Sequence, residues 1–138
     1  MRISTLLVLL AVAAGAGCNS DIDPVNRCVP MPLRPEPDAV LDNGCLDFSD
    51  EIVWEFAWTA CDRATAYHLF AARDGAPLPV IDLDTIEGTT FTFEGGGYVA
   101  EPNRTGWSWR VRSRTSAGWG PWSDPRSFEV EPADTDCP

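Results

Sequence analysis

The chain contains no lysine, a single histidine and no hydrophobic run long enough to cross a membrane. Its ten basic residues are all arginines, against 21 aspartates and glutamates, so its formal net charge is −11. This acidity argues against nucleic acid as a partner and against docking on an anionic membrane by charge, because both need a basic surface. With His68 as the only histidine, no Ser-His-Asp or Cys-His set can be assembled. The sequence therefore predicts no catalytic residue and no cofactor.

The N-terminal residues have the pattern of an export signal. Arg2 precedes an apolar stretch over residues 3–14, which is too short for a membrane-spanning helix, and small residues then lead to Cys18. Residues 1–17 resemble a bacterial lipoprotein signal peptide. That resemblance implies lipidation of Cys18, a location at the cell envelope and membrane attachment through this lipid only. Ordinary secretion with a free Cys18 is the alternative.

The cysteine count fits this interpretation. The chain has five cysteines, and lipidation of Cys18 leaves the even number expected for two disulfides in an oxidising compartment. No Cys-x-x-Cys or His/Cys cluster indicates zinc. The acidic loops around Asp47 and Asp82 are interpreted as solvated loops, although their oxygens are the type of ligand that calcium prefers. We expect no bound metal.

Two regions follow the signal. Residues 18–37 are rich in Pro, Asp and Asn and are predicted to form a tether, whereas residues 38–138 are predicted to form the folded domain. In this domain short alternating runs are separated by turn residues, and no long helical pattern occurs. Seven strands are expected, at residues 39–41, 52–58, 66–72, 80–83, 89–93, 106–114 and 127–130. The predicted fold class is all-β, a seven-stranded antiparallel β-sandwich.

Residues 106–123 hold four of the six tryptophans. Strand alternation places Trp107, Trp109 and Val111 on one face. The opposite face receives Arg110, Arg112 and Arg114. The tryptophans after the next turn, Trp119 and Trp122, are expected to stack on these guanidinium groups. The alternative is an exposed aromatic and basic surface that binds a ligand.

Several of these residues resemble the fibronectin type III family. They are Trp58, the run at 64–69, the run at 107–111, and Trp119, Trp122 and Ser123 with Gly120 and Pro121 between them. The last set is similar to the Trp-Ser-x-Trp-Ser box of cytokine-receptor members, with Gly120 in place of the first serine. In those members tryptophans interleave with arginines of the preceding strand. The resemblance implies a fibronectin type III or immunoglobulin-like sandwich and a recognition module, but no particular partner.

The strand order that this resemblance implies also selects a disulfide pairing. Cys28 and Cys61 would share one pole of the sandwich, and Cys45 and Cys137 the other. A Cys45–Cys61 bridge would have to span the length of the 52–58 strand, far more than a disulfide allows. We expect the pairs Cys28–Cys61 and Cys45–Cys137.

Two functions remain open. The first is a lipid-anchored, extracytoplasmic binding or adhesion module that recognises a protein and is not an enzyme. The alternative is a carbohydrate-binding module that uses exposed tryptophans, with Trp119 at the loop tip as the candidate ligand-binding residue. The partner is thus an unknown protein or glycan at the cell envelope.

Overall fold

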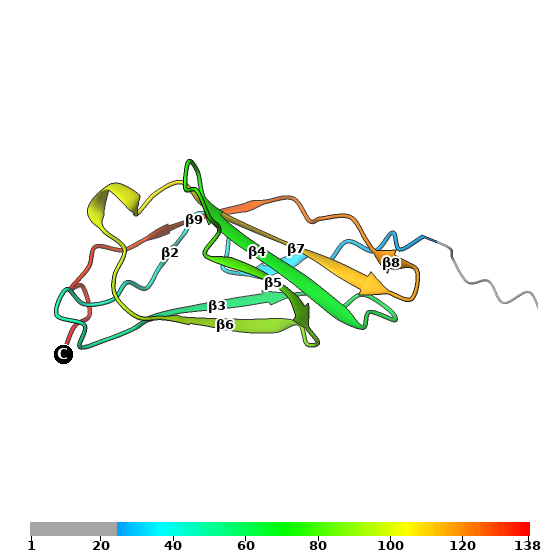
Figure 1. The fold of residues 1–138 in the computed structure, drawn as a ribbon, viewed down its shortest axis with the longest axis horizontal. Helices are drawn as coiled ribbons and strands as arrows, with labels where there is room; N and C mark the ends of the chain where they lie inside the picture. Colours follow the sequence, from blue (N-terminus) through cyan, green and yellow to red (C-terminus); the bar gives the residue numbers. More distant parts are fainter. Residues whose placement is uncertain (1–24) are drawn as a thin grey trace, which may run out of the picture.

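The computed structural model describes residues 25–138, which form nine short strands and one 3₁₀ turn joined by loops (Figure 1). They are β1 (Pro32–Arg34), β2 (Ala39–Leu41), β3 (Ile52–Trp58), β4 (Ala66–Arg73), β5 (Ile81–Ile86), β6 (Thr90–Gly95), η1 (Glu101–Asn103), β7 (Trp107–Thr115), β8 (Gly118–Trp119) and β9 (Arg126–Val130). Within these residues no helix is long and apolar enough to span a bilayer. The predicted signal peptide and Cys18 lie outside this range.

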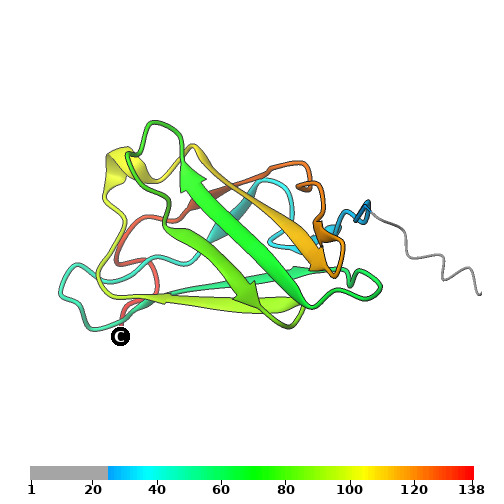
Figure 2. The same cartoon turned by 45° about the vertical axis from the view of Figure 1, so that its right-hand side comes forward.

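The strands form the two layers of a sandwich (Figure 2). One sheet has the order β1-β3-β6, and the other has the order β2-β9-β7-β4-β5 with β8 added to β7. The predicted β-sandwich is therefore confirmed. One pairing is not antiparallel, because β2 runs parallel to β9. The chain leaves the first sheet after β1 and joins the second at β2 without reversing direction, so β2 lies parallel to the last strand.

The core lies between the sheets and is rich in aromatic rings. Alternation in β3 buries Ile52, Trp54, Phe56 and Trp58 on one face, as expected for a strand with one face toward the core. From the opposite sheet, Trp109 packs edge-on against Phe56 with 5.2 Å between ring centroids. Each buried aromatic ring removes a large apolar area from water, which stabilises the fold.

The predicted tether is wrong from residue 25 onward. Asn26 is buried, and its amide donates hydrogen bonds to the backbone oxygens of Ser113 and Gly118. Further along, β1 pairs with β3. The prolines of this segment suit an edge strand as well as an extended linker, and only the contacts of Asn26 and β1 distinguish the two. The folded part thus begins before residue 38, while residues 18–24 of the predicted tether lie outside the described range.

The two predicted disulfides are present, one at each end of the sandwich. Cys28–Cys61 lies at the end where the described chain begins, which we call the proximal pole. Cys45–Cys137 lies at the opposite end, near the C-terminus, which we call the distal pole (Figure 1). In each pair the Cα atoms are 5.9 Å apart. Two disulfides are typical of proteins in an oxidising environment.

Candidate functional site

The segment after β7 returns along this strand and is held to it by hydrogen bonds. The backbone N–H of Gly120 donates to the oxygen of Ser113, and that of Ser123 donates to the oxygen of Val111, both at 2.8 Å. The Ser123 hydroxyl, which is buried, accepts the N–H of Val111 at 3.0 Å. These contacts fix the positions of Trp119 and Trp122, which lie on either side of Gly120 in the chain.

Arginines and tryptophans alternate on the outer face of this sheet, as the sequence predicts. We call Arg110, Arg112, Arg114, Trp119 and Trp122 the Arg–Trp ladder. The Cζ atoms of Arg110 and Arg112 each lie 4.5 Å from the ring centroid of Trp122. The Cζ atoms of Arg112 and Arg114 lie 4.8 and 5.7 Å from the ring centroid of Trp119. Each tryptophan thus separates two arginines, which reduces their mutual repulsion.

His68 on β4 extends the ladder sideways. The Nη2 atom of Arg112 donates to the Nδ1 atom of His68 at 3.1 Å. The Nε2 atom of His68 lies 2.6 Å from the carboxylate of Asp82 on β5. Since a guanidinium can only donate, Nδ1 accepts and the Nε2–H group donates to Asp82. Arg112 therefore occupies the ring nitrogen that would have to accept a proton from a nucleophilic side chain. Together these side-chain hydrogen bonds link the three strands β7, β4 and β5.

Trp119 is only half-buried, but its ring is not free. Arg112 and Arg114 both lie over it, and the ring of His68 is 5.7 Å from it between centroids. None of the six tryptophans, all of which lie in residues 25–138, is exposed. The alternative function needs a flat exposed tryptophan, whereas here three indoles enter the core and the others pack at its margin or in the ladder.

Gly120 leaves no room for a side chain. A Cβ at this position would lie 2.9 Å from the amide nitrogen of Asn26 and 2.9 Å from the oxygen of Cys28. Real Cβ atoms do not approach other atoms so closely. The N-terminal segment therefore occupies the space that a serine side chain would need.

A second candidate surface, which the sequence analysis missed, lies at the distal pole. Phe48 is 69% exposed and Tyr98 is 41% exposed, and their ring centroids are 6.1 Å apart. Leu46, two residues before Phe48 in the chain, is 52% exposed. Large apolar side chains gathered in this way are typical of interaction surfaces. The sequence feature that could have indicated this surface is the phenylalanine between Asp47 and Ser49. It lies in a turn, where a large apolar side chain is not expected to be buried.

The loop that carries Phe48 is tightly constrained. Phe48 has a φ of 61°, a left-handed conformation that is rare for a bulky residue. Its N–H donates to the oxygen of Cys45 at 2.9 Å, and the N–H of Leu46 donates to Asp134 at 2.7 Å. Hydrogen bonds from the Ser49 hydroxyl and then its backbone N–H lower the pKa of Asp47. The strained conformation is therefore maintained by several contacts, as at sites where strain serves a function.

Asn43 joins this loop to the other segments of the distal pole. Its amide donates to the oxygens of Val99 and Glu131 at 3.0 and 2.8 Å, and its side-chain oxygen accepts the N–H groups of Gly44 and Val99. A Cβ on Gly44 would overlap the oxygen of Gly97, so only glycine permits this close approach. The distal loops are thus joined to one another by these hydrogen bonds and by this close approach.

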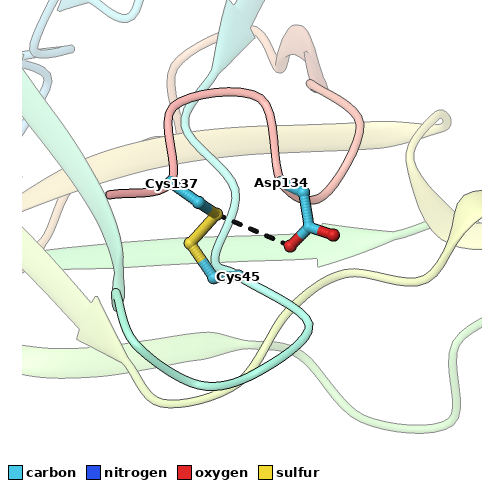
Figure 3. Close-up of side chains that lie close together, drawn as sticks. All are labelled: Cys45, Asp134 and Cys137. Atoms are coloured by element: carbon cyan, nitrogen blue, oxygen red, sulfur yellow. Dashed lines mark hydrogen bonds between the residues drawn. A yellow bond between two sulfur atoms is a disulfide. The ribbon is translucent and has the colours of Figure 1, made fainter.

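Cys45, Cys137 and Asp134 lie close together at this pole, as Figure 3 shows, and such a cluster can resemble a metal site. The two sulfurs are bonded to each other, so neither offers the thiolate that a metal requires. The Asp134 oxygen that lies 3.5 Å from the Cys137 sulfur also accepts the N–H of Leu46. The disulfide and the hydrogen bond from Leu46 to Asp134 therefore hold the C-terminal segment against the loop that contains Cys45.

The comparisons with known proteins concern the fold. No protein-family model matches the chain, and no curated protein matches it. Among solved structures, the chain is similar to a Fn3-like protein from Clostridium thermocellum, with a TM-score of 0.45 and 18% identity, over 76% of this chain and 94% of that one. The order of the strands in the two sheets is by itself that of a fibronectin type III-like β-sandwich, and this is the fold class of the chain.

Proposed function

We propose that this protein is a non-catalytic, extracytoplasmic module that is anchored by a lipid on Cys18 and binds a protein partner through its distal pole. The observation that carries the proposal is Phe48, which is 69% exposed and yet fixed in a left-handed conformation. A side chain that is ordered before binding loses less conformational entropy when a partner covers it. Exposed aromatic residues are also the ones that contribute most at protein interfaces.

The direction of the chain supports this arrangement. Val25, the first described residue, lies at the proximal pole. Only six residues lie between it and Cys18, and an extended chain covers at most about 3.3–3.6 Å per residue. A lipid on Cys18 would thus hold the proximal pole near the membrane and leave the distal pole available to a partner.

Photo-crosslinking at the cell envelope tests the binding function. A photoreactive phenylalanine analogue replaces Phe48 in the full-length chain, and a matched variant carries it at Gly88, an exposed turn residue with no heavy atom near its Cβ position. We expect a discrete protein adduct from position 48 and none from position 88. Equal labelling from both positions, or no adduct from position 48, would contradict the proposal.

Lipidation is tested separately. We expect the wild-type chain to incorporate labelled fatty acid and to sediment with membranes, and the Cys18→Ser variant to do neither. Secretion of an unlabelled wild-type chain would show that the alternative, ordinary export, is correct.

Carbohydrate binding through Trp119 is the alternative function. Its support is that Trp119, at the end of the short strand β8, keeps part of its surface exposed. The two arginines over its ring argue against this alternative, since a pyranose needs a free aromatic face. Glycan-array binding that disappears in a folded Trp119→Ala variant would favour this alternative.

A further inference from the structure

The apolar surface of the distal pole is surrounded by carboxylates. We call Leu46, Phe48 and Tyr98 the distal patch. The three chain segments around this patch, residues 42–51, 94–104 and 131–138, contain one arginine, Arg104. They contain nine acidic residues, namely Asp42, Asp47, Asp50, Glu51, Glu94, Glu101, Glu131, Asp134 and Asp136. The net charge of −11 is therefore concentrated at this end of the molecule rather than spread evenly.

Little within the protein neutralises these carboxylates. Among residues 25–138, only Glu101 of this group forms an ion pair, with Arg104 at 2.7 Å. Asp42 and Asp134 accept backbone N–H groups, of Val53 and Leu46, which orient them without cancelling their charge. The ladder arginines lie on β7 and stack on tryptophans, so they do not offset the distal charge.

Resting on the proposed function, we propose that the distal patch binds a segment of a protein partner that presents arginine or lysine beside apolar side chains. An apolar centre with a charged rim is the usual composition of a protein interface, and here nine acidic residues face a single arginine, Arg104. The rings of Phe48 and Tyr98 accept a cation on their faces as well as an apolar side chain. A strongly acidic rim also increases the association rate of a basic partner.

Other occupants fit less well. An anionic membrane surface or a nucleic acid would be repelled by the rim. A second copy of this chain meeting pole to pole would bring two acidic rims together. A basic and apolar polypeptide segment satisfies both the patch and the rim.

The test uses titration of the mature protein with two synthetic peptides of equal length, one alternating arginine with leucine and one alternating glutamate with leucine. We expect the arginine peptide to bind, with an affinity that falls as salt increases, and the glutamate peptide not to bind. The Phe48→Asn variant should lose about tenfold or more in affinity, as a central aromatic contact does. Asparagine tolerates the left-handed conformation, so this variant is expected to fold.

Matched controls separate the patch from general effects. Met31→Asn removes an apolar residue that is 58% exposed outside the distal segments, and its affinity should equal that of wild type. Asp50→Asn and Glu51→Gln should each weaken binding, whereas Asp84→Asn on β5 should not. Folding of every variant is verified by its thermal unfolding midpoint.

Three results would overturn the inference. They are equal affinity for both peptides, unchanged affinity in Phe48→Asn, and Phe48-dependent self-association or oligosaccharide binding in place of peptide binding. A crosslink from position 48 to a partner without a basic surface would overturn this inference while the proposed function stands. Absence of any crosslink from position 48 would remove the proposed function itself.

Discussion

Single buried contacts decide where the loops of this protein lie. Asn26 and Asn43 are polar residues with little exposure, and each forms hydrogen bonds to segments far away in the chain. Gly120 leaves the room that the Asn26 segment needs. Buried amides with all their partners specify one arrangement, because any other arrangement leaves polar atoms without hydrogen bonds.

Gly120→Ala is expected to destabilise the protein by about 1–3 kcal/mol, since the new methyl group overlaps Asn26 and Cys28. The matched control is Gly88→Ala, where no heavy atom lies within 4 Å of the added carbon. The control should be neutral or stabilising by up to about 1 kcal/mol. Denaturant unfolding with the disulfides intact measures both changes in stability. Equal changes in the two variants would contradict the close packing of Gly120 against Asn26 and Cys28.

Asn43→Asp is expected to lower the free energy of unfolding by about 2–4 kcal/mol. The carboxylate cannot donate the two hydrogen bonds that the amide gives to the oxygens of Val99 and Glu131, and its negative charge would face these oxygens. Asn103→Asp, at an exposed position in η1, is the control and should change stability little. Hydrogen exchange at the distal loops provides a second measurement. Protection that is unchanged in Asn43→Asp would contradict the role assigned to this residue.

At the scale of elements, the outer face of the larger sheet is stabilised by stacking rather than by ion pairs. The ladder connects β7 to the segment after β8, and His68 and Asp82 extend it to β4 and β5. This face is therefore committed largely to internal contacts. The distal loops, in contrast, direct their aromatic residues outward.

Arg112→Met is expected to lower the free energy of unfolding by about 1–2 kcal/mol, because Arg112 lies over two tryptophan rings. Arg114→Met, which loses a single contact at 5.7 Å from an exposed position, should change it by less than about 0.5 kcal/mol. Chemical unfolding monitored by tryptophan fluorescence distinguishes them. A larger effect at Arg114 would show that the ladder does not stabilise this face as described.

At the scale of the whole molecule, one disulfide constrains each pole. Cys28–Cys61 spans 33 residues and Cys45–Cys137 spans 92. The first fixes the segment that the sequence presented as a tether, and the second fixes the C-terminal segment beneath the distal patch. Together they restrict both ends of a small domain whose core alone gives modest stability.

Replacing each cysteine pair by serines is expected to lower stability by about 4 kcal/mol for Cys28–Cys61 and about 5 kcal/mol for Cys45–Cys137, as upper values from the closed loop lengths. Urea unfolding of the two double variants measures the order. Only loss of the distal pair should also weaken binding at the distal patch. Impaired peptide binding after loss of Cys28–Cys61, with the fold retained, would contradict this division.

Much of the fold could be predicted from the sequence because it depends on local patterns. Alternation identified all seven strands of the expected set, and the resemblance to fibronectin type III domains gave the strand order from which both disulfides followed. The same alternation placed Arg110, Arg112 and Arg114 on one face. The two short strands β1 and β8 were missed, since two or three residues carry too little pattern.

The sequence by itself determined the class of fold and the composition of the Arg–Trp ladder, since both follow from local periodicity. It determined the cysteine pairing only through its resemblance to fibronectin type III domains. Only the tertiary structure decided which side chains remain available to a partner. Exposure depends on what distant segments cover: Arg112 and Arg114 lie over Trp119, whereas within residues 25–138 most of Phe48 is left uncovered. That difference moved the candidate binding surface from the tryptophan-rich hairpin to the acidic distal pole.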